Sequence, residues 1–302
     1  MRFSLVFTLL ALPLSGHAAE PPATAAPVKA VLVTGASTGI GRNVTEHLAA
    51  AGYFVYAGAR KDADLAALGK IKNVQAIKLD VTRQADVDAA VVTVTKAGRG
   101  LYGLVNNAGV ASPGLTSASS MAEFDLTLQV NVYGPYRMSQ AFRPLLVASK
   151  GRITNIGSIS GILAPKMLNA YSISKHGVEA FTDSLNSELE PDGVIVNIVE
   201  PGNFNSEIGA NAAKRTGVTT VMADRSKYKQ PDEVSAAIML ALFEDQPKRR
   251  YLVTPDQSEA DRTIRKQIEQ LAQLNEDHPY SYSRDDLVKM LDEALAKTRQ
   301  KK

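Results

Sequence analysis

The sequence predicts an α/β fold in which helices cover both faces of a doubly wound parallel sheet of about seven strands. Short apolar runs recur along the chain, amphipathic stretches separate them, and no linker interrupts the alternation. Strands of a parallel sheet are buried on both faces, so they are apolar along their whole length instead of alternating with polar residues. These three observations together favour a single domain.

The apolar runs are expected to form the strands, and the stretches between them the helices. One such stretch follows the first run and carries Ile40, Val44, Leu48 and Ala51 at helical spacing. The runs expected to be strands cover residues 28–34, 53–58, 74–79, 102–107, 151–157, 193–199 and 250–254.

Composition excludes several kinds of site. The chain has 302 residues, of which 45% are apolar and 22% charged, and its net charge is +3. Because it has no cysteine, it forms no disulfide, thiolate zinc site or cysteine nucleophile. The histidines His17, His47, His176 and His278 show no metal-ligand spacing, so no metal is expected. Dense basic clusters occur only at 248–250 and at the last residues, so nucleic-acid binding is not expected.

The N-terminal segment has the pattern of a secretory signal peptide over residues 1–18. A basic second residue precedes an apolar run at 3–14, and Gly16 and Ala18 give the small-x-small cleavage pattern. Residues 19–27 would then be a Pro/Ala linker, and the apolar run is shorter than the about 20 residues of a membrane span. We expect export to the periplasm or the exterior. Two alternatives stay open: an uncleaved anchor, and a start codon assigned too far upstream of a cytoplasmic enzyme.

The first apolar run ends in TGASTGIG, residues 34–41. Its glycines, Gly35, Gly39 and Gly41, predict a turn that lets the backbone approach a pyrophosphate, followed by a helix whose N-terminus favours an anion. Ligands of doubly wound sheets bind at the carboxyl ends of the strands, where this turn is expected to lie. The segment is therefore a candidate nucleotide-binding loop.

Further motifs follow in order along the chain: LDV at 79–81, NNAG at 106–109, LQVNVYG at 128–134, GSISG at 157–161, YSISK at 171–175 and EPGNFNS at 200–206. With the Thr-Gly-x-x-x-Gly-Ile-Gly spacing, they resemble the classical short-chain dehydrogenase/reductase (SDR) family. Within it, the segments look most like the retinol and hydroxysteroid dehydrogenase branch. The resemblance implies a Rossmann-type catalytic domain over residues 28–256, an oxidoreductase activity and a nicotinamide cofactor.

The resemblance also implies roles for individual residues. Asn131, Ser158, Tyr171 and Lys175 match the catalytic tetrad of the family. Asp80 matches a residue that contacts the adenine, the 106–109 segment one that braces the sheet, and Ser206 a hydroxyl on the nicotinamide carboxamide. The residues expected to bind the cofactor are Gly35, Ser37, Thr38, Gly39, Ile40, Gly41, Arg60, Asp80, Val81, Asn107, Ala108, Gly109, Tyr171, Lys175, Pro201, Gly202 and Ser206.

The spacing of Tyr171 and Lys175 suits acid/base chemistry. Four residues are about one helical turn, so the two side chains should lie on one face of a helix. Hydride transfer to or from a carbinol carbon requires a proton to reach or leave the oxygen, and an ordinary tyrosine, with a pKa of about 10, is a poor base near neutrality. A nearby ammonium stabilises the phenolate. Ser158 is expected to hydrogen-bond the substrate oxygen and, by resemblance, Asn131 to hold a relaying water.

Cofactor preference is predicted from VYAGAR, residues 55–60, at the end of the second strand. NAD-binding folds usually place an acidic side chain there, which accepts from the ribose 2′-hydroxyl and repels a 2′-phosphate. Ala59 occupies that position here, and Arg60 follows it, with Lys61 as a second cation nearby. We therefore expect NADP(H) to be preferred over NAD(H). Thr38 stands where some NADP-specific relatives have a basic residue, and a contribution from Arg42 stays open.

The predicted substrate is a mainly apolar small molecule, such as a steroid, retinoid or lipid-like compound. The segment after Ser158 and the loop carrying Phe204 and Ile208 offer apolar surface beside the nicotinamide. Alternatively, these side chains only pack the loops onto the sheet. A second class of function also stays open, a nucleotide-binding sensor or scaffold without turnover, although an intact tetrad argues against it.

Residues 257–302 form a C-terminal helical extension beyond the minimal fold. Its second helix is expected to begin after Ser283, with Asp286 completing the cap. An apolar stripe along that helix requires a partner surface, either the substrate pocket or another subunit. Because family members commonly pair through the helices that carry Asn131 and Tyr171, the resemblance implies a homodimer or homotetramer.

Overall fold

The computed structural model describes residues 28–219 and 224–299. The predicted signal peptide and linker, residues 1–18 and 19–27, lie outside the described residues, so their processing stays a prediction. Within the described part of the chain, no helix combines the length and the apolar character needed to cross a membrane.

Each predicted apolar run forms one strand of a single parallel sheet, in the order β3-β2-β1-β4-β5-β6-β7. The order reverses at β1, which pairs with β2 on one side (Leu32 with Tyr56) and with β4 on the other (Leu32 with Leu104). The predicted doubly wound sheet is therefore confirmed. The strands are β1 (Ala30–Val33), β2 (Phe54–Ala59), β3 (Val74–Lys78), β4 (Gly103–Asn106), β5 (Arg152–Ile156), β6 (Ile195–Pro201) and β7 (Arg250–Val253).

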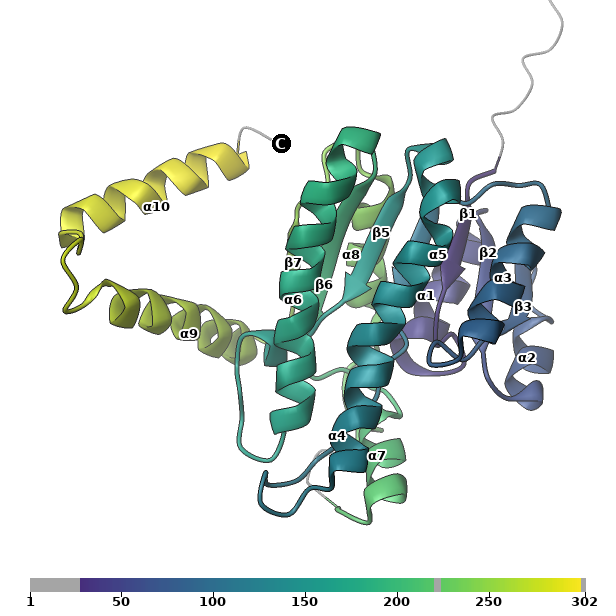
Figure 1. Ribbon diagram of the computed structural model, residues 1–302, viewed down its shortest axis with the longest axis horizontal. Helices are drawn as coiled ribbons and strands as arrows, with labels where there is room; N and C mark the ends of the chain where they lie inside the picture. Colours follow the sequence, from purple (N-terminus) through teal and green to yellow (C-terminus); the bar gives the residue numbers. More distant parts are fainter. Residues whose placement is uncertain (1–27, 220–223, 300–302) are drawn as a thin grey trace, which may run out of the picture.

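Helices cover the two faces of the sheet in separate layers (Figure 1). One layer consists of α1 (Gly39–Ala50), α2 (Asp62–Leu68) and α8 (Asp232–Phe243), whose apolar sides pack on Val31, Val33 and Val55. The other layer consists of α3 (Gln84–Lys96), α5 (Gly134–Ser149) and α6 (Asn169–Leu189), which pack on Leu32, Leu104 and Ile153. Adjacent residues of one strand thus belong to different cores, which explains why the strands are apolar throughout.

Two short helices lie beyond the carboxyl end of the sheet, α4 (Met121–Leu128) and α7 (Ile208–Thr216). In Figure 1 the chain enters β1 from the top, so this end of the sheet lies at the bottom, beside α4 and α7. These helices flank the edge at which a doubly wound sheet binds its ligand.

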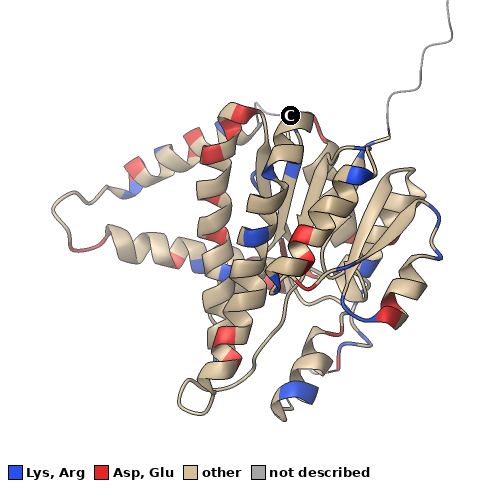
Figure 2. Cartoon of the chain, turned by 45° about the vertical axis from the view of Figure 1, so that its right-hand side comes forward, with Lys and Arg blue, Asp and Glu red and all other residues tan. Residues whose placement is uncertain are grey.

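The C-terminal extension consists of α9 (Gln257–Asn275) and α10 (Arg284–Arg299), which project from the body of the protein (Figure 1). The predicted cap of α10 is present: the Asp286 N–H donates to Ser283 Oγ at 3.2 Å, and the Ser283 hydroxyl donates to the Asp286 carboxylate at 2.6 Å. Its apolar stripe stays exposed, with Leu291 at 59%. Charges of both signs are interspersed along both helices (Figure 2).

Tyr56 supplies a test of the core. Its ring is fully buried on β2, and its hydroxyl has no hydrogen-bond partner among the residues that the structure describes. Tyr56→Phe should therefore leave the free energy of unfolding unchanged or raise it by up to about 1 kcal/mol, because a buried unpaired hydroxyl is removed.

Tyr251→Phe is the matched control, since the Tyr251 hydroxyl accepts the Lys248 N–H at 2.9 Å. We expect that variant to lose about 1 kcal/mol in urea denaturation. Equal losses for both variants would show that the Tyr56 hydroxyl is paired in solution.

Candidate active site

A cavity of about 400 Å³ opens at the carboxyl ends of the strands, where the sequence predicts the cofactor. Of the predicted site residues, only Gly41 and Asn131 do not line it. The lining includes Gly35, Ser37, Thr38, Gly39, Ile40, Arg60, Asp80, Val81, Asn107, Ala108, Gly109, Ser158, Tyr171, Lys175, Pro201, Gly202 and Ser206. The structure therefore brings together motifs that are spread over more than half of the sequence.

The glycine loop between β1 and α1 packs closely on neighbouring segments, where side chains at its glycines would clash. Gly35 has φ +64°, and a Cβ on it would lie 2.8 Å from the Cα of Ala108. Gly39 has φ +55°, and a Cβ there would lie 3.1 Å from the Cβ of Ser206. Gly41 is a packing residue, because a Cβ there would collide with the Gly35 carbonyl. These positions need glycine for conformation or for space.

The helix that follows this loop has a free N-terminus. Thr38 is the N-cap of α1, yet its side chain makes no capping hydrogen bond, and the first turn holds no acidic residue. Unpaired N–H groups at a helix start, together with the helix dipole, attract phosphate groups. The loop and the helix start thus fit the pyrophosphate of a dinucleotide.

A polar brace fixes the glycine loop to the end of β4, as the NNAG segment predicts. The Asn107 side-chain amide donates to the carbonyls of Thr34 at 2.9 Å and Gly35 at 3.0 Å. In return, the Thr34 hydroxyl accepts the backbone N–H groups of Asn107 and Ala108, each at 3.0 Å. The bonds replace the strand ladder where it ends, so the loop keeps one geometry.

Tyr171 and Lys175 lie one turn apart on α6, as predicted. Lys175 is only 5% exposed, and its ammonium donates to the Ile156 carbonyl at 2.7 Å. The same Nζ lies 5.6 Å from the centroid of the Tyr171 ring. The positive charge is therefore held beside the tyrosine by a bond to the end of β5.

Ser158 follows the end of β5 and faces the cavity. Its Oγ accepts the Ser160 N–H at 3.1 Å, in the short helical turn Ile159–Gly161. A hydroxyl that accepts one hydrogen bond still has its own proton to donate. Ser158 is thus a turn residue and also an available donor to a substrate oxygen.

Asn131 lies behind the cavity wall rather than on it. It is buried within a π-helical turn, Gln129–Tyr133, between α4 and α5. Its carbonyl oxygen accepts the Val110 N–H at 2.8 Å, and its amide donates to the Val110 carbonyl at 2.9 Å and to Ser174 Oγ at 2.9 Å. Asn131 therefore ties the segment after NNAG to α6, next to Lys175. No pattern in the sequence indicates the π-helical turn.

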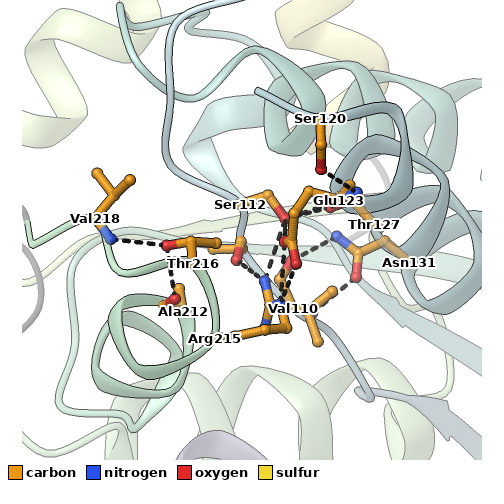
Figure 3. A network of polar contacts seen from close by, with 11 residues as sticks. Val110, Ser112, Ser120, Glu123, Thr127, Asn131, Ala212, Arg215, Thr216 and Val218 are labelled. Carbon is orange, nitrogen blue, oxygen red and sulfur yellow. Dashed lines mark hydrogen bonds and ion pairs between the residues drawn. The ribbon is translucent and has the colours of Figure 1, made fainter. Parts of the chain in front are cut away.

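A polar network continues from this turn to α7 (Figure 3). Arg215 Nε lies 3.0 Å from both carboxylate oxygens of Glu123, and another guanidinium nitrogen donates to the Ala111 carbonyl at 2.6 Å. Ser112 Oγ and Thr127 Oγ1 are 2.7 Å apart, and Thr127 is one turn before Asn131. The network fastens α7, whose Ala212 lines the cavity, to the helix that carries Asn131.

At the other end of the cavity, Arg60 follows Ala59 at the end of β2, and both line the cavity. Of the other cations considered for this end, Arg42 pairs with Glu46 on α1 at 2.5 Å, and Lys61 does not line the cavity. Arg60 is therefore the cation of this strand end that faces the ligand site.

The prediction that Phe204 offers apolar surface to the cavity is wrong. Phe204 is 1% exposed and belongs to the core beneath α1 and α8, whereas Ile208 lines the cavity as expected. The sequence shows both residues in one loop and cannot tell which of them faces the sheet. Leu163, Pro165 and Leu168, from the segment after Ser158, also line the cavity.

The family model for short chain dehydrogenases matches residues 29–217. The chain belongs to this family. Mitochondrial D-beta-hydroxybutyrate dehydrogenase of Rattus norvegicus is 41% identical over 192 residues, which cover 60% of this chain and 56% of that enzyme. The chain thus spans just over half the length of this relative. An NADPH-dependent 3-dehydrocapnine reductase of Ornithobacterium rhinotracheale is 34% identical, over 74% of this chain and 87% of that enzyme.

Solved structures agree with the fold. A short-chain dehydrogenase from Streptomyces avermitilis superimposes with a TM-score of 0.71 and 30% identity, over 83% of this chain and 96% of that one. The chain therefore has the sheet and the helical layers that its motifs predict, and it belongs to the oxidoreductase family that they resemble.

Behind the active site, the SDR chain contains a cluster of carboxyl groups that the sequence did not predict. Glu179 lies one turn after Lys175, and its carboxylate is next to Gly157 and Gly161, on either side of the Ser158 turn. Arg250 Nε lies 3.2 Å from Glu179 and 3.7 Å from Glu200. Glu200 is 2% exposed and precedes the Pro201–Gly202 pair in sequence.

Burial is the main cause of the raised pKa values of the two glutamates in this cluster. Burial, together with the neighbouring Glu179 carboxyl, raises the pKa of Glu200 to about 8, although Arg250 acts to lower it. The pKa of Glu179 is also raised, again chiefly by burial. Two neighbouring buried carboxylates repel each other, so the protonated form of one of them is favoured.

Stability should therefore depend on pH through Glu200. Because its folded pKa lies above its unfolded value, its contribution is fully present below about pH 4.5 and is lost as the pH rises to about 8. Glu200→Gln keeps a neutral side chain and should flatten this decline in the free energy of unfolding. Glu188→Gln, at an exposed site on α6, is the control. An unchanged pH slope in Glu200→Gln would assign the decline to other groups.

Proposed function

We propose that this chain is an NADP(H)-preferring oxidoreductase that interconverts an alcohol and a ketone or aldehyde on a mainly apolar small molecule, with Tyr171 as the acid/base. The observation that carries the proposal is the placement of the buried Lys175 ammonium 5.6 Å from the Tyr171 ring, in a cavity that Ser158 also lines. A cation, a phenol and a hydroxyl around one cavity are the groups that carbonyl reduction requires.

Each residue of the site would have a separate role in the reaction. The bound nicotinamide would supply or accept the hydride. Tyr171 would give a proton to the substrate oxygen in reduction and take it in oxidation, while the Lys175 charge stabilises the phenolate. Ser158 would donate its free proton to the same oxygen and hold it within reach of the phenol. Asn131 would act indirectly, by fixing the positions of Val110 and α6. A water relay beside it stays a prediction.

NADP preference rests on the charges at the end of β2. Arg60 forms no ion pair with any residue in the described ranges, so its guanidinium is available for a 2′-phosphate. The first acid after Arg60 in the sequence, Asp62, is already 2.5 Å from Lys78 Nζ. The named NADPH dependence of the Ornithobacterium relative also supports the preference.

An apolar substrate is supported by Leu163, Leu168 and Ile208 on the cavity wall. Relatives include a 3beta-hydroxysteroid dehydrogenase of Caenorhabditis elegans, 37% identical over 64% of this chain and 53% of that enzyme. Homodimer or homotetramer formation is proposed as well, because Tyr136 on α5 and Ile173 on α6 are 55% and 49% exposed on the helices expected to pair.

Tyr171→Phe should lower kcat by about 10²- to 10⁴-fold, because it deletes the titrating hydroxyl and little else. NADPH affinity should stay close to wild type. Steady-state turnover with an accepted ketone and a fluorescence titration of NADPH measure the two effects. Tyr53→Phe, at a tyrosine that stacks on Phe243 and does not line the cavity, is the control, and near-normal turnover by Tyr171→Phe would refute the mechanism.

Arg60→Ala should weaken NADP binding about tenfold to a hundredfold, which corresponds to the roughly 1.5–3 kcal/mol of a charge-assisted contact. NAD affinity should barely change. Titrations of both cofactors against wild type, Arg60→Ala and the neighbouring Lys61→Ala test this. Tighter binding of NAD than NADP by the wild type would contradict the assignment.

A further inference from the structure

The first turn of α9 is anchored directly on the segment that follows β6. Glu259 is 6% exposed and accepts the Asn203 backbone N–H at 2.9 Å, and its other carboxylate oxygen accepts the Asn203 side-chain amide. A Cβ on Gly202 would collide with the same carboxylate. The Thr263 hydroxyl, also buried, donates to the Glu259 carbonyl at 2.7 Å. This attachment lies outside the family match at 29–217, so the extension supplies it.

The anchored turn brings Arg262 to the cavity. Arg262 lines the cavity, and its side chain is 60% exposed at the rim. Its nearest carboxylate oxygen belongs to Glu259, at 3.9 Å, and both oxygens of Glu259 are already occupied by Asn203. The guanidinium therefore keeps donors for another acceptor.

A second arginine reaches the same region from the loop before α8. Residues 224–231 of this loop pack on Asn205, whose backbone N–H donates to the Lys229 carbonyl at 2.9 Å and whose amide donates to the Ser226 carbonyl at 3.4 Å. Arg225 lines the cavity, and its Nε is buried without a hydrogen-bond partner in the described part of the chain. A buried cationic N–H without an acceptor is costly, which indicates that a ligand completes it.

The two arginines lie on the reactive side of the cavity. Both segments are bonded to residues 203–205, which follow β6, and β6 pairs with β5, whose end carries Ser158. Arg60 and Asp80 belong to the other side, after β2 and β3. Lys175 already donates to Ile156, and Glu207 is the one acid among the lining residues near α7. At this end of the cavity, three cations, Lys175, Arg225 and Arg262, face one acid, so the net charge is positive.

We propose that Arg225 and Arg262 bind an anionic group of the substrate, so that the substrate is a hydroxy acid or oxo acid with an apolar body. Guanidinium groups match the planar carboxylate and form paired charge-assisted hydrogen bonds with it. The carboxylate would lie at the rim, the apolar chain against Leu163 and Ile208, and the carbinol carbon at Tyr171. This inference rests on the proposed function and narrows its substrate class.

The test compares medium-chain oxo acids with their methyl esters, which are nearly the same shape but uncharged. Wild type with NADPH should give a higher kcat/KM for the acid. Arg262→Ala and Arg225→Ala should each raise the KM for the acid about tenfold to a hundredfold, with kcat and the ester kinetics little changed. Arg262→Lys should recover part of the loss. Arg265→Ala is the matched control, because Arg265 pairs with Asp261 at 2.8 Å and does not line the cavity.

Binding provides a readout besides turnover. The acid should raise the Tm of the NADP-bound protein, and the rise should be absent in both alanine variants. Equal use of acid and ester by the wild type would overturn the anion site and leave the proposed function intact. Weaker NADPH binding in the variants, with the acid KM unchanged, would assign the arginines to a cofactor phosphate and also overturn it. If no carbonyl compound is turned over although NADPH binds, both proposals fail.

Discussion

The hydrogen bond from Lys175 to the Ile156 carbonyl is the contact on which the reactive geometry depends. An ammonium that is 5% exposed needs acceptors, because an uncompensated buried charge destabilises the folded state. The bond satisfies one of its three donors and leaves the others facing the cavity. It also fixes α6 against the end of β5, so the positions of Tyr171 and Ser158 follow from one contact between a helix and a strand.

Other parts of the carboxyl edge are built on the same principle. Where the strand ladder ends, a buried side-chain amide takes over the backbone bonds: Asn107 for the glycine loop, and Asn131 for the segment around Val110. An amide both donates and accepts, so it can pair with a peptide group as another strand would. This gives loops near the rigidity of a sheet, which a site needs if it is to hold a hydride donor and acceptor in line.

Sequence patterns predicted the features that depend on neighbours along the chain. The strands were found because both faces are buried, and the cap at Ser283 because its partner Asp286 is three residues away. Features that depend on distant partners were missed. Phe204 and Ile208 look alike in sequence, and only the packed sheet decides that one enters the core and the other the cavity. Similarly, Glu259 and Asn203 are far apart along the chain, and nothing local marks them as partners.

The structure distinguishes the two partner surfaces that the sequence left open for the apolar stripe of the extension, the substrate pocket and another subunit. The contact with the pocket is made by the polar first turn of α9, through Glu259 and Arg262, and not by the stripe of α10, none of whose described residues lines the cavity. The stripe continues on α9, where Ile268 is 60% exposed, and neither helix has an excess of basic residues that would favour an anionic membrane. Isolated helices of this length are marginal in water, so burial of the exposed apolar faces would stabilise both helices. A subunit that covers them would also fix the angle of α9, and with it the position of Arg262 over the cavity.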